Sequence, residues 1–330
     1  MLRQVGPRLT CVRRDGSAPA RFAVWRRAHH RNSRLPPHLQ HTLGAPVQFS
    51  GVGVHTGQTV EVTISPAAAG AGINFVRTDV SGLDPRISAR ADKVCETRLG
   101  TVIGNADGVT VSTVEHIMAV FCGLGVDNAV VAINGPETPI MDGSCDPFVR
   151  LIDRAGRRPQ QTARDYIEIL EPIEVTDGEK RAALLPADGF EIAFEILFDT
   201  AAIGRQRIDL TLDEAVFRRD LADCRTFGFL HEVEALRAAG LARGGSMENV
   251  VVIDDGAVLN PFGLRRSDEF VRHKALDAIG DLYLLGAPLI GRYEGLYSGH
   301  GLNNLLTRAV LARPSAWRIA SAPTHLARAV

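Results

Sequence analysis

Residues 267 to 286, SDEFVRHKALDAIGDLYLLG, predict one helix with signals at both ends, around which the rest of the fold can be inferred. Ser267 is suited to cap its start, and two acidic residues follow it, where they favour the positive end of the helix dipole. Gly286 comes shortly before Pro288, a combination that is typical of a helix end. The pattern therefore predicts a helix across the whole stretch.

Three ionisable residues recur inside this helix, where an ordinary helix would carry core residues. His273, Asp277 and Asp281 stand four positions apart and share one face. Much of the remaining helix is apolar, so this row borders a packed interior. Burying such groups unpaired costs several kcal/mol each, and a divalent metal would remove that cost. A solvated face or a local ion pair is the plain alternative.

The composition indicates a soluble protein that is long enough for two domains of ordinary size. The chain has 330 residues, of which 45% are hydrophobic and 23% charged, and it can bury a substantial core. No apolar run approaches the ~20 residues of a membrane-spanning helix, so we expect no transmembrane segment. Five well-separated cysteines without C-x-x-C spacing predict reduced thiols and a cytoplasmic location.

The basic residues are unevenly distributed. The formal net charge is −1, yet residues 1 to 37 hold nine Arg and a single acidic residue, Asp15. Beyond them, 28 basic residues stand against 37 acidic ones, a balance of −9, which disfavours nucleic acid as a partner. For the Arg-rich extension we consider a disordered tail, a start codon assigned too early and an organelle transit peptide, and we favour the first two.

Ordered structure is predicted to begin near Leu39 and to consist of two similar units. Residues 47 to 67 alternate like strands, with His55 in a GVHTG turn, where a lone histidine is more often structural than catalytic. Residues 60 to 76 and 180 to 196 both read as strand, Pro-Ala turn, glycine and strand, and each unit continues to a helix with a histidine and an apolar strand. We predict an α+β fold in which two similar domains, each a β-sheet packed on α-helices, bring these helices together.

The domain limits follow from an interruption of the pattern by Pro, Gln and Arg near the middle of the chain. We expect an extension at residues 1 to 37, a first domain at 38 to 162 and a second at 163 to 325. Residues 86 to 110 and 228 to 262 read as insertions, one in each unit, and the second should hold a short helix and a strand pair. Such insertions are natural walls of a binding site, so we expect the active site between the domains.

The first of the two similar helices carries another candidate metal ligand. STVEHIMAVF, residues 112 to 121, places Glu115 directly before His116. This order is shared with H-E-x-x-H enzymes, in which one residue binds zinc and its neighbour handles the water. Ala and Val follow where a second ligand would stand, so the other ligands must come from elsewhere. The second helix offers His273 and Asp277, and two histidines, one carboxylate and a water form a standard open zinc site.

Two further motifs contain side chains with suitable chemistry. YSGH, residues 297 to 300, presents His300 after a glycine turn and close to the second helix in the predicted fold. CRTFGF, residues 224 to 229, places the Thr226 hydroxyl beside an aromatic side chain. Taken singly, a threonine in a strand and a histidine after a turn are more often structural.

In order and spacing, the chain resembles the zinc-dependent UDP-3-O-acyl-N-acetylglucosamine deacetylase family of lipid A biosynthesis over about residues 38 to 320. The resemblance is carried by STVEHIMAVFCGLGVDN, PETPIMDGSCDPF, CRTFGF, DEFVRHKALDAIGDLYLLG and YSGHGLNN. The chain departs from the pattern at Gly100, where some members have a cysteine near the metal, and in the Arg-rich extension.

The resemblance implies a catalytic centre built on one Zn²⁺ ion, with Fe²⁺ as an alternative in the cell. Its ligands would be His116, His273 and Asp277. Glu115 would act as the general base. His300 would be the protonated partner that stabilises the oxyanion or assists the leaving amine.

The remaining candidates have implied roles around this centre. Thr226 corresponds to a residue that donates a hydrogen bond to the tetrahedral intermediate, and Asp281 to the partner that orients the catalytic histidine. Lys274 matches a residue that contacts the nucleotide sugar. Phe227 and His55 match positions that line the site.

The function implied by the resemblance is hydrolysis of the acetamide of UDP-3-O-(3-hydroxyacyl)-N-acetylglucosamine, the committed step of lipid A biosynthesis. The products would be acetate and UDP-3-O-acyl-glucosamine, and the enzyme would be a cytoplasmic monomer. One alternative is a non-catalytic descendant that binds nucleotide sugar or lipid, and another is a metal hydrolase that acts on a different acylated amide.

Overall fold

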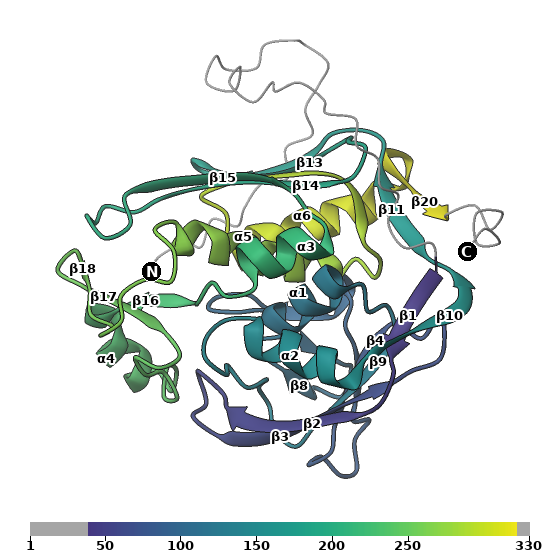
Figure 1. Ribbon diagram of the computed structural model, residues 1–330, viewed down its shortest axis with the longest axis horizontal. Helices are drawn as coiled ribbons and strands as arrows, with labels where there is room; N and C mark the ends of the chain where they lie inside the picture. Colours follow the sequence, from purple (N-terminus) through teal and green to yellow (C-terminus); the bar gives the residue numbers. More distant parts are fainter. Residues whose placement is uncertain (1–38, 322–330) are drawn as a thin grey trace, which may run out of the picture.

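The computed structural model describes residues 39–321, and two helices lie at the centre of this part. They are α1 (Glu115–Leu124) and α5 (Glu269–Tyr283). Two further helices flank them, α2 (Asp146–Ala155) and α6 (His300–Ala312). Figure 1 shows one β-sheet beyond α1 and α2 and another beyond α5 and α6, so the molecule is layered as sheet, helices, helices and sheet. The apolar core fills the space between these layers.

The first sheet has five strands in the order β2-β3-β9-β4-β5. Adjacent strands in this sheet are antiparallel, except that β4 and β9 run parallel to each other. β9 follows α1 directly in the chain, so the parallel pair is reached by a helical crossover. The bounds are β2 (Val47–Val52), β3 (Thr59–Pro66), β4 (Ile73–Arg77), β5 (Arg86–Ser88) and β9 (Ala129–Ile133).

The second sheet repeats this arrangement within its seven strands. Its strands β12-β13-β19-β14-β15 have the same order, and only β14 and β19 among them are parallel. The bounds are β12 (Ile173–Asp177), β13 (Lys180–Leu185), β14 (Phe190–Leu197), β15 (Arg205–Thr211) and β19 (Leu289–Leu296). β11 (Asp165–Ile169) and β20 (Trp317–Ser321) extend the sheet. The predicted α+β fold of two similar units is therefore confirmed.

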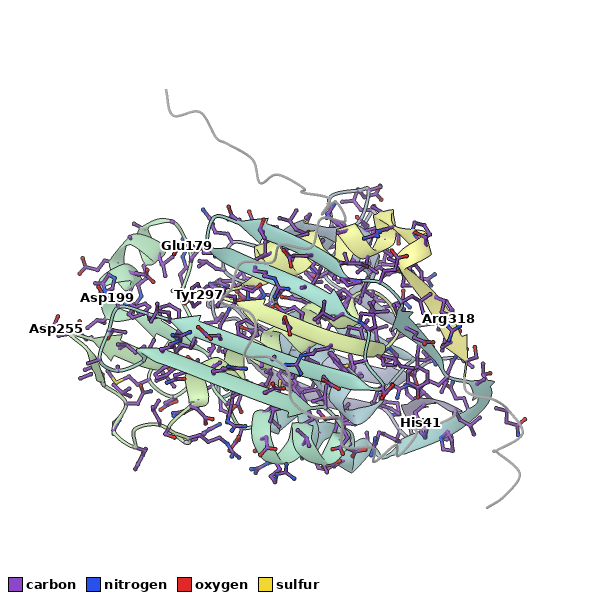
Figure 2. The ribbon with its side chains drawn as sticks, turned by 90° about the horizontal axis from the view of Figure 1, so that it is seen from above. His41, Glu179, Asp199, Asp255, Tyr297 and Arg318 are labelled. Atoms are coloured by element: carbon purple, nitrogen blue, oxygen red, sulfur yellow. The ribbon has the colours of Figure 1, made fainter. Side chains whose placement is uncertain are left out.

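The outer face of the second sheet carries charged side chains, and no helix among residues 39–321 covers it. Figure 2 views it from above, with Glu179 and Asp199 in its turns. Arg292 on β19 binds Glu191 on the adjacent strand β14 and Asp209 on β15, the strand beyond it, at 2.9 Å each. Side chains along each strand alternate between the two faces of the sheet, and these cross-strand ion pairs lie on the outer face. The sheet therefore buries only its other face against the helices.

Helix α5 is shorter at both ends than the predicted stretch of residues 267 to 286, because it runs from Glu269 to Tyr283. Its N-cap residue is Asp268, so the prediction of Ser267 as the cap is wrong. The Asp268 carboxylate accepts a hydrogen bond from Arg272 Nε at 2.7 Å, and it does not cap the backbone. Gly286, with φ of 98°, lies just past the helix end, in keeping with the predicted stop signal.

The two central helices touch at a glycine. A Cβ atom on Gly280 of α5 would overlap the backbone carbonyl oxygen of Glu115, the first residue of α1. The missing side chain allows the backbones to approach closely at this point. The first turn of α1 therefore lies directly against the polar row of α5.

Each predicted insertion forms a small three-stranded sheet. The first sheet consists of β6 (Val94–Glu96), β7 (Val102–Gly104) and β8 (Thr110–Val111). The second consists of β16 (Phe227–Phe229), β17 (Val251–Asp254) and β18 (Ala257–Val258), together with the helix α4 (Leu230–Ala238). Asp255 and Gly256 join β17 to β18 with φ of 43° and 78°, as a tight hairpin turn requires.

The two units are connected by an extended segment. β10 (Arg157–Ala163) pairs with β1 (Leu39–Leu43) and runs across the predicted limit between residues 162 and 163. The predicted domain limits stay predictions, and those at residues 37 and 325 lie outside the described part. The remaining short elements are η2 (Ala91–Lys93), α3 (Glu214–Val216), η3 (Phe217–Leu221) and η4 (Pro314–Ala316). Within residues 39–321 no helix combines the length and apolar character needed to cross a membrane.

Candidate active site

Three side chains from the two central helices converge in a buried cluster. One potential ligand atom from each of His116, His273 and Asp277 lies within 4.8 Å of the others. Asp277 Oδ1 is 3.5 Å from His116 Nε2 and 3.4 Å from His273 Nε2. All three residues are at most 4% exposed. The structure thus brings together residues that are 161 positions apart in sequence, from His116 to Asp277.

The chemistry of this cluster fits a divalent metal. Asp277 Oδ1, which faces both imidazoles, is buried and has no hydrogen-bond partner, a costly state for a polar atom in a protein interior. Two imidazoles and one carboxylate are the donor set of many catalytic zinc sites, in which a fourth position stays open. His273 Nδ1 contacts the backbone carbonyl of Cys224 at 3.1 Å, which leaves the lone pair of Nε2 free to bind a metal.

Burial and neighbouring charges shift the pKa values of His273 and Asp277 in the directions that favour metal binding. Burial lowers the pKa of His273 to about 4, although the nearby Asp277 carboxylate opposes this shift. Burial alone would raise the pKa of Asp277, but His273 and the ammonium group of Lys274 outweigh it and hold the pKa well below its usual range. A neutral imidazole and an ionised carboxylate are the forms that bind a metal.

A second pair of ionisable groups lies beside the cluster. Glu115 is the first residue of α1 and His300 the first of α6, and 3.8 Å separates Glu115 Oε1 from His300 Nε2. Burial raises the pKa of Glu115, although the charges of His300 and His116 oppose it. Burial alone would lower the pKa of His300, but the carboxylates of Asp281 and Glu115 outweigh it and raise the pKa to about 9.

Asp281 is the main hydrogen-bond partner of this histidine. Its Oδ2 lies 2.9 Å from His300 Nδ1 and accepts a second bond from Asn303 Nδ2 at 2.9 Å. Its Oδ1 accepts a bond from the Thr101 hydroxyl at 2.5 Å. The third member of the polar row on α5 is therefore fully satisfied by protein groups and points His300 Nε2 toward the cluster.

Thr101 is a site residue that sequence reasoning missed. Besides its bond to Asp281, its backbone N–H donates to Glu115 Oε2 at 2.9 Å. The neighbouring Gly100 lets this loop between β6 and β7 approach, because a Cβ there would come within 2.9 Å of Glu115 Oε1. No local pattern around Thr101 signals this role. Asn303 was also missed, although it follows His300 by three positions within the quoted YSGHGLNN motif.

The CRTFGF segment forms one wall beside the cluster. Phe227 packs edge-on against the His273 ring at 6.5 Å and against Phe270 at 5.0 Å. Thr226, directly before it, donates its backbone N–H to the carbonyl of Gly143 at 2.8 Å. Thr226 therefore lies between two residues of this segment, Cys224 and Phe227, that both contact His273.

Lys274 and His55 lie at different distances from the cluster. Lys274 Nζ is 3.4 Å from Asp277 Oδ2, so the lysine is adjacent to a candidate ligand. His55 is more remote: its Nε2 contacts the carbonyl of Leu99 at 3.3 Å, and its own carbonyl accepts the N–H of Arg243. It thus lies where the first insertion meets the loop of the second.

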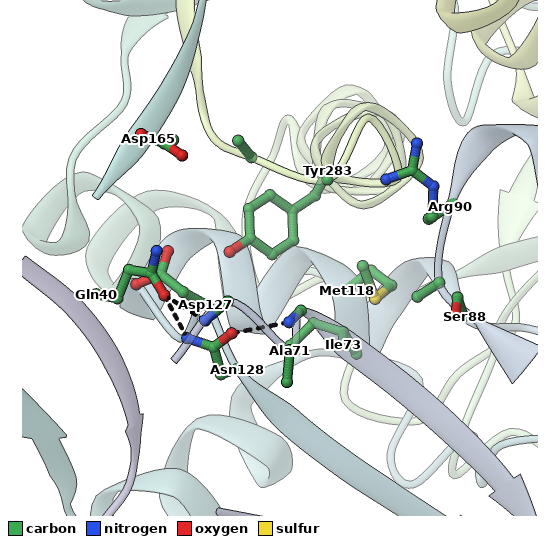
Figure 3. Close-up of a pocket in the computed structure, with 15 residues that line it drawn as sticks. Gln40, Ala71, Ile73, Ser88, Arg90, Met118, Asp127, Asn128, Asp165 and Tyr283 are labelled. Carbon is green, nitrogen blue, oxygen red and sulfur yellow. Dashed lines mark hydrogen bonds between the residues drawn. The ribbon is translucent and has the colours of Figure 1, made fainter. Parts of the chain in front are cut away.

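A separate cavity of about 240 Å³ lies around the C-terminal end of α5 (Figure 3). Its polar side chains already have hydrogen-bond partners within the protein. Asn128 donates to Gln40 at 2.9 Å and accepts from the N–H of Gly72 at 2.8 Å, and Asp127 binds Arg164 at 2.7 Å. It contains none of the residues predicted for the site, and we assign no catalytic role to it.

Known proteins of one family match almost all of the described chain. The family model of UDP-3-O-acyl N-acetylglycosamine deacetylase matches residues 40–312. A protein from Phenylobacterium zucineum named UDP-3-O-acyl-N-acetylglucosamine deacetylase is 68% identical over 88% of this chain and all of its own length. Proteins of the same name from Shewanella halifaxensis and Teredinibacter turnerae are each 48% identical, over 86% and 85% of this chain and 93% and 92% of their own lengths. This chain therefore belongs to the UDP-3-O-acyl N-acetylglycosamine deacetylase family.

Proposed function

We propose that this protein hydrolyses the acetamide of UDP-3-O-(3-hydroxyacyl)-N-acetylglucosamine, releasing acetate and UDP-3-O-acyl-glucosamine, the committed step of lipid A biosynthesis. The observation that carries this proposal is the buried cluster of His116, His273 and Asp277 with Glu115 and His300 beside it. The chain's membership of the deacetylase family supplies the substrate class.

His116, His273 and Asp277 would hold one Zn²⁺ ion, and Fe²⁺ could take its place in the cell. The donor set and the buried Asp277 oxygen without a hydrogen-bond partner support this assignment. When bound, the ion lowers the pKa of a water molecule and polarises the acetyl carbonyl, which an amide needs because it is a poor electrophile.

The residues beside the ligands move the protons. Glu115, as general base, accepts a proton from the attacking water. His300, held by Asp281 with its pKa raised to about 9, carries a proton at neutral pH. It can stabilise the developing oxyanion and protonate the departing amine. The hydroxyl of Thr226 donates a further hydrogen bond to the tetrahedral intermediate.

The walls of the site suit the two ends of the substrate. Lys274, beside Asp277, provides a positive charge for the nucleotide sugar, and His55 lines the junction of the two insertions. The acyl chain would follow the aromatic cluster in which Phe198 packs against Phe227 at 5.7 Å and Phe229 at 5.8 Å. These half-buried rings offer an apolar surface that begins next to His273.

We place the enzyme in the cytoplasm as a monomer. The four cysteines within the described part are all free, in keeping with a reducing compartment. Light scattering of the purified protein would test the monomeric state, because a dimer would double the measured mass.

A deacetylation assay with and without a chelator tests the central proposal. We expect acetate release from the UDP-sugar substrate, its loss after chelation and its return when Zn²⁺ is added. Binding of the substrate without turnover in the metal-loaded protein would favour the non-catalytic alternative. Faster hydrolysis of an unrelated acylated amide in the same assay would favour the other alternative.

A further inference from the structure

A buried ion pair lies behind the metal cluster and contacts none of its ligands through its charged groups. Arg225 Nε is 2.8 Å from Glu269 Oε1, and Arg225 Nη2 is 3.1 Å from Glu269 Oε2. The two side chains are 9% and 0% exposed. Burying two charges is expensive, and apolar side chains often give equal stability at such positions. The pair therefore calls for a reason other than stability.

The two side chains of the ion pair also bind backbone groups of Arg225, Gly263 and Arg265. Glu269 Oε1 also accepts the N–H of Arg225 at 2.9 Å, and Glu269 Oε2 accepts the N–H of Arg265 at 2.7 Å. Arg225 Nη2 donates to the carbonyl of Gly263 at 2.8 Å. One carboxylate at the start of α5 thus binds the backbone of two loops, at Arg225 and at Arg265.

One neighbour of Arg225 sets the orientation of a metal ligand. The carbonyl of Cys224 accepts the Nδ1–H of His273, one helical turn after Glu269, at 3.1 Å. This bond selects the tautomer in which Nε2 has the free lone pair and turns that atom toward Asp277. If segment 224 to 226 shifted, the imidazole would lose its orienting acceptor.

The other neighbour of Arg225 is Thr226, whose hydroxyl is proposed to bind the tetrahedral intermediate. Its backbone is held from outside by Gly143 and Val251, each through one hydrogen bond of 2.8 Å. The Arg225 anchor completes this support from the α5 side. The same ion pair thereby reaches a candidate ligand on one side and a candidate catalytic hydroxyl on the other.

We propose that Glu269 and Arg225 are positioning residues for the metal centre. They hold the Cys224 carbonyl against His273 and keep Thr226 in place. This inference rests on the proposed metal site, and its test is chosen to be independent of the substrate. Removing the charge of Glu269, or replacing the forked guanidinium of Arg225 by a group that cannot make both hydrogen bonds, weakens metal binding, because it releases the group that orients His273.

The molecule contains a matched control for this pair. Arg164 Nε binds Asp127 Oδ1 at 2.7 Å, and the side chains are 5% and 11% exposed. Asp127 Oδ2 also accepts a backbone N–H, that of His41, at 2.7 Å. Figure 3 shows Asp127 at the separate cavity beyond the end of α5. This pair has the same chemistry and similar burial but contacts no residue of the metal cluster.

The test measures metal affinity in Glu269→Gln, Arg225→Lys and the control Asp127→Asn. Zinc dissociation constants come from competition with a chromophoric chelator, and the absorption spectrum of the Co²⁺-loaded protein reports ligand geometry. We expect both site variants to bind zinc about 10- to 100-fold more weakly, the range typical of outer-shell partners, and to alter the Co²⁺ spectrum. Asp127→Asn should lower the melting temperature but leave both readouts unchanged.

A double variant separates positioning from stability. Arg225→Met with Glu269→Gln leaves no buried charge unpaired, so its melting temperature should exceed that of Glu269→Gln alone. Its zinc affinity should remain weak, because the bonds between Glu269 and Arg225 that hold the Cys224 carbonyl are still absent. Unchanged zinc affinity and Co²⁺ spectrum in folded Arg225→Lys would overturn the proposal. Affinity that recovers together with the melting temperature in the double variant would do the same. A wild-type protein that binds zinc without turnover would count against the proposed function and not against this inference.

Discussion

The two central helices occupy equivalent places in the two repeats but carry different polar residues. On α1 the buried polar residues are Glu115 and His116 in the first turn, and apolar residues fill the remainder. On α5 a buried polar residue recurs at every turn from Glu269 to Asp281. The two helices therefore have the same place in the fold, whereas the chemistry that each can support depends on which of its positions hold polar side chains.

The row on α5 also shows how to tell a supporting residue from a candidate ligand. Glu269 and Asp281, at its two ends, are satisfied by Arg225 and by His300 together with other donors. Asp277, in the middle, has a buried oxygen with no hydrogen-bond partner. The contrast indicates that Asp277, unlike the residues at the two ends, is suited to bind a metal ion.

Replacing His273 by Ala is the most severe test of this contrast. The change removes one of two ligands from α5, so we expect loss of both bound zinc and detectable deacetylation. Metal content after gel filtration and acetate release would measure the two effects. A variant that keeps its full zinc content would exclude His273 as a ligand.

Replacing Glu115 by Ala tests the α1 side, where the residue next to a ligand is proposed to have no metal role. We expect zinc content to be unchanged and kcat to fall by about 10²- to 10⁴-fold, the range for loss of a general base. Loss of zinc together with activity would instead make Glu115 part of the metal site, and the two helices would then differ less than we infer.

Replacing His300 by Ala tests the group that the end of the α5 row orients. We expect zinc to be kept and the rate to fall by about 10²-fold, at the lower end of the range for a general acid. His300 is proposed to act protonated, and its pKa is raised to about 9, so wild-type kcat/KM should decline as the pH rises through that value. Glu115 is proposed to act ionised, so kcat/KM should also decline as the pH falls through its raised pKa.

The alkaline side of this profile should disappear in zinc-loaded His300→Ala enzyme. The comparison needs the variant because another group could titrate in the same range. An alkaline limb that persists unchanged would refute His300 as the required acid.

A smaller effect is expected at the aromatic rings beside the second insertion. If the acyl chain lies along Phe198, Phe227 and Phe229, each methylene removed should cost ~0.8 kcal/mol, or about fourfold in kcat/KM. Shortening the chain by two carbons should lower kcat/KM by about 15-fold. A series of substrates of decreasing length would measure this slope, and a flat response would remove these rings from the acyl path.

The smallest effect is expected outside both repeats. A protein that starts at His38 should keep full activity, because every proposed site residue and the family match lie after that point. Activity and zinc content of the shortened protein would be compared with those of the full chain. A large loss of either would show that residues 1 to 37 contribute to the centre.

The sequence alone determined the fold class and the members of the cluster, since both depend on local patterns. The four-residue spacing of His273, Asp277 and Asp281 specifies one face of a helix wherever that helix packs. The repeated order of strands, helix and strand predicted two similar units, and the strand order of both sheets agrees with it. Residue types in adjacent positions, such as Glu115 before His116, already indicated metal-assisted hydrolysis.

The tertiary structure alone decided how these residues are supported. Thr101 donates to both Glu115 and Asp281, although 180 positions separate it from the latter, and nothing in its own neighbourhood signals those bonds. The position of Gly280 against Glu115, and that of Glu269 against Arg225, likewise arises only when the two units fold onto each other. Local periodicity records which face of a helix is buried, but it contains no information about which distant backbone or charge will meet that face.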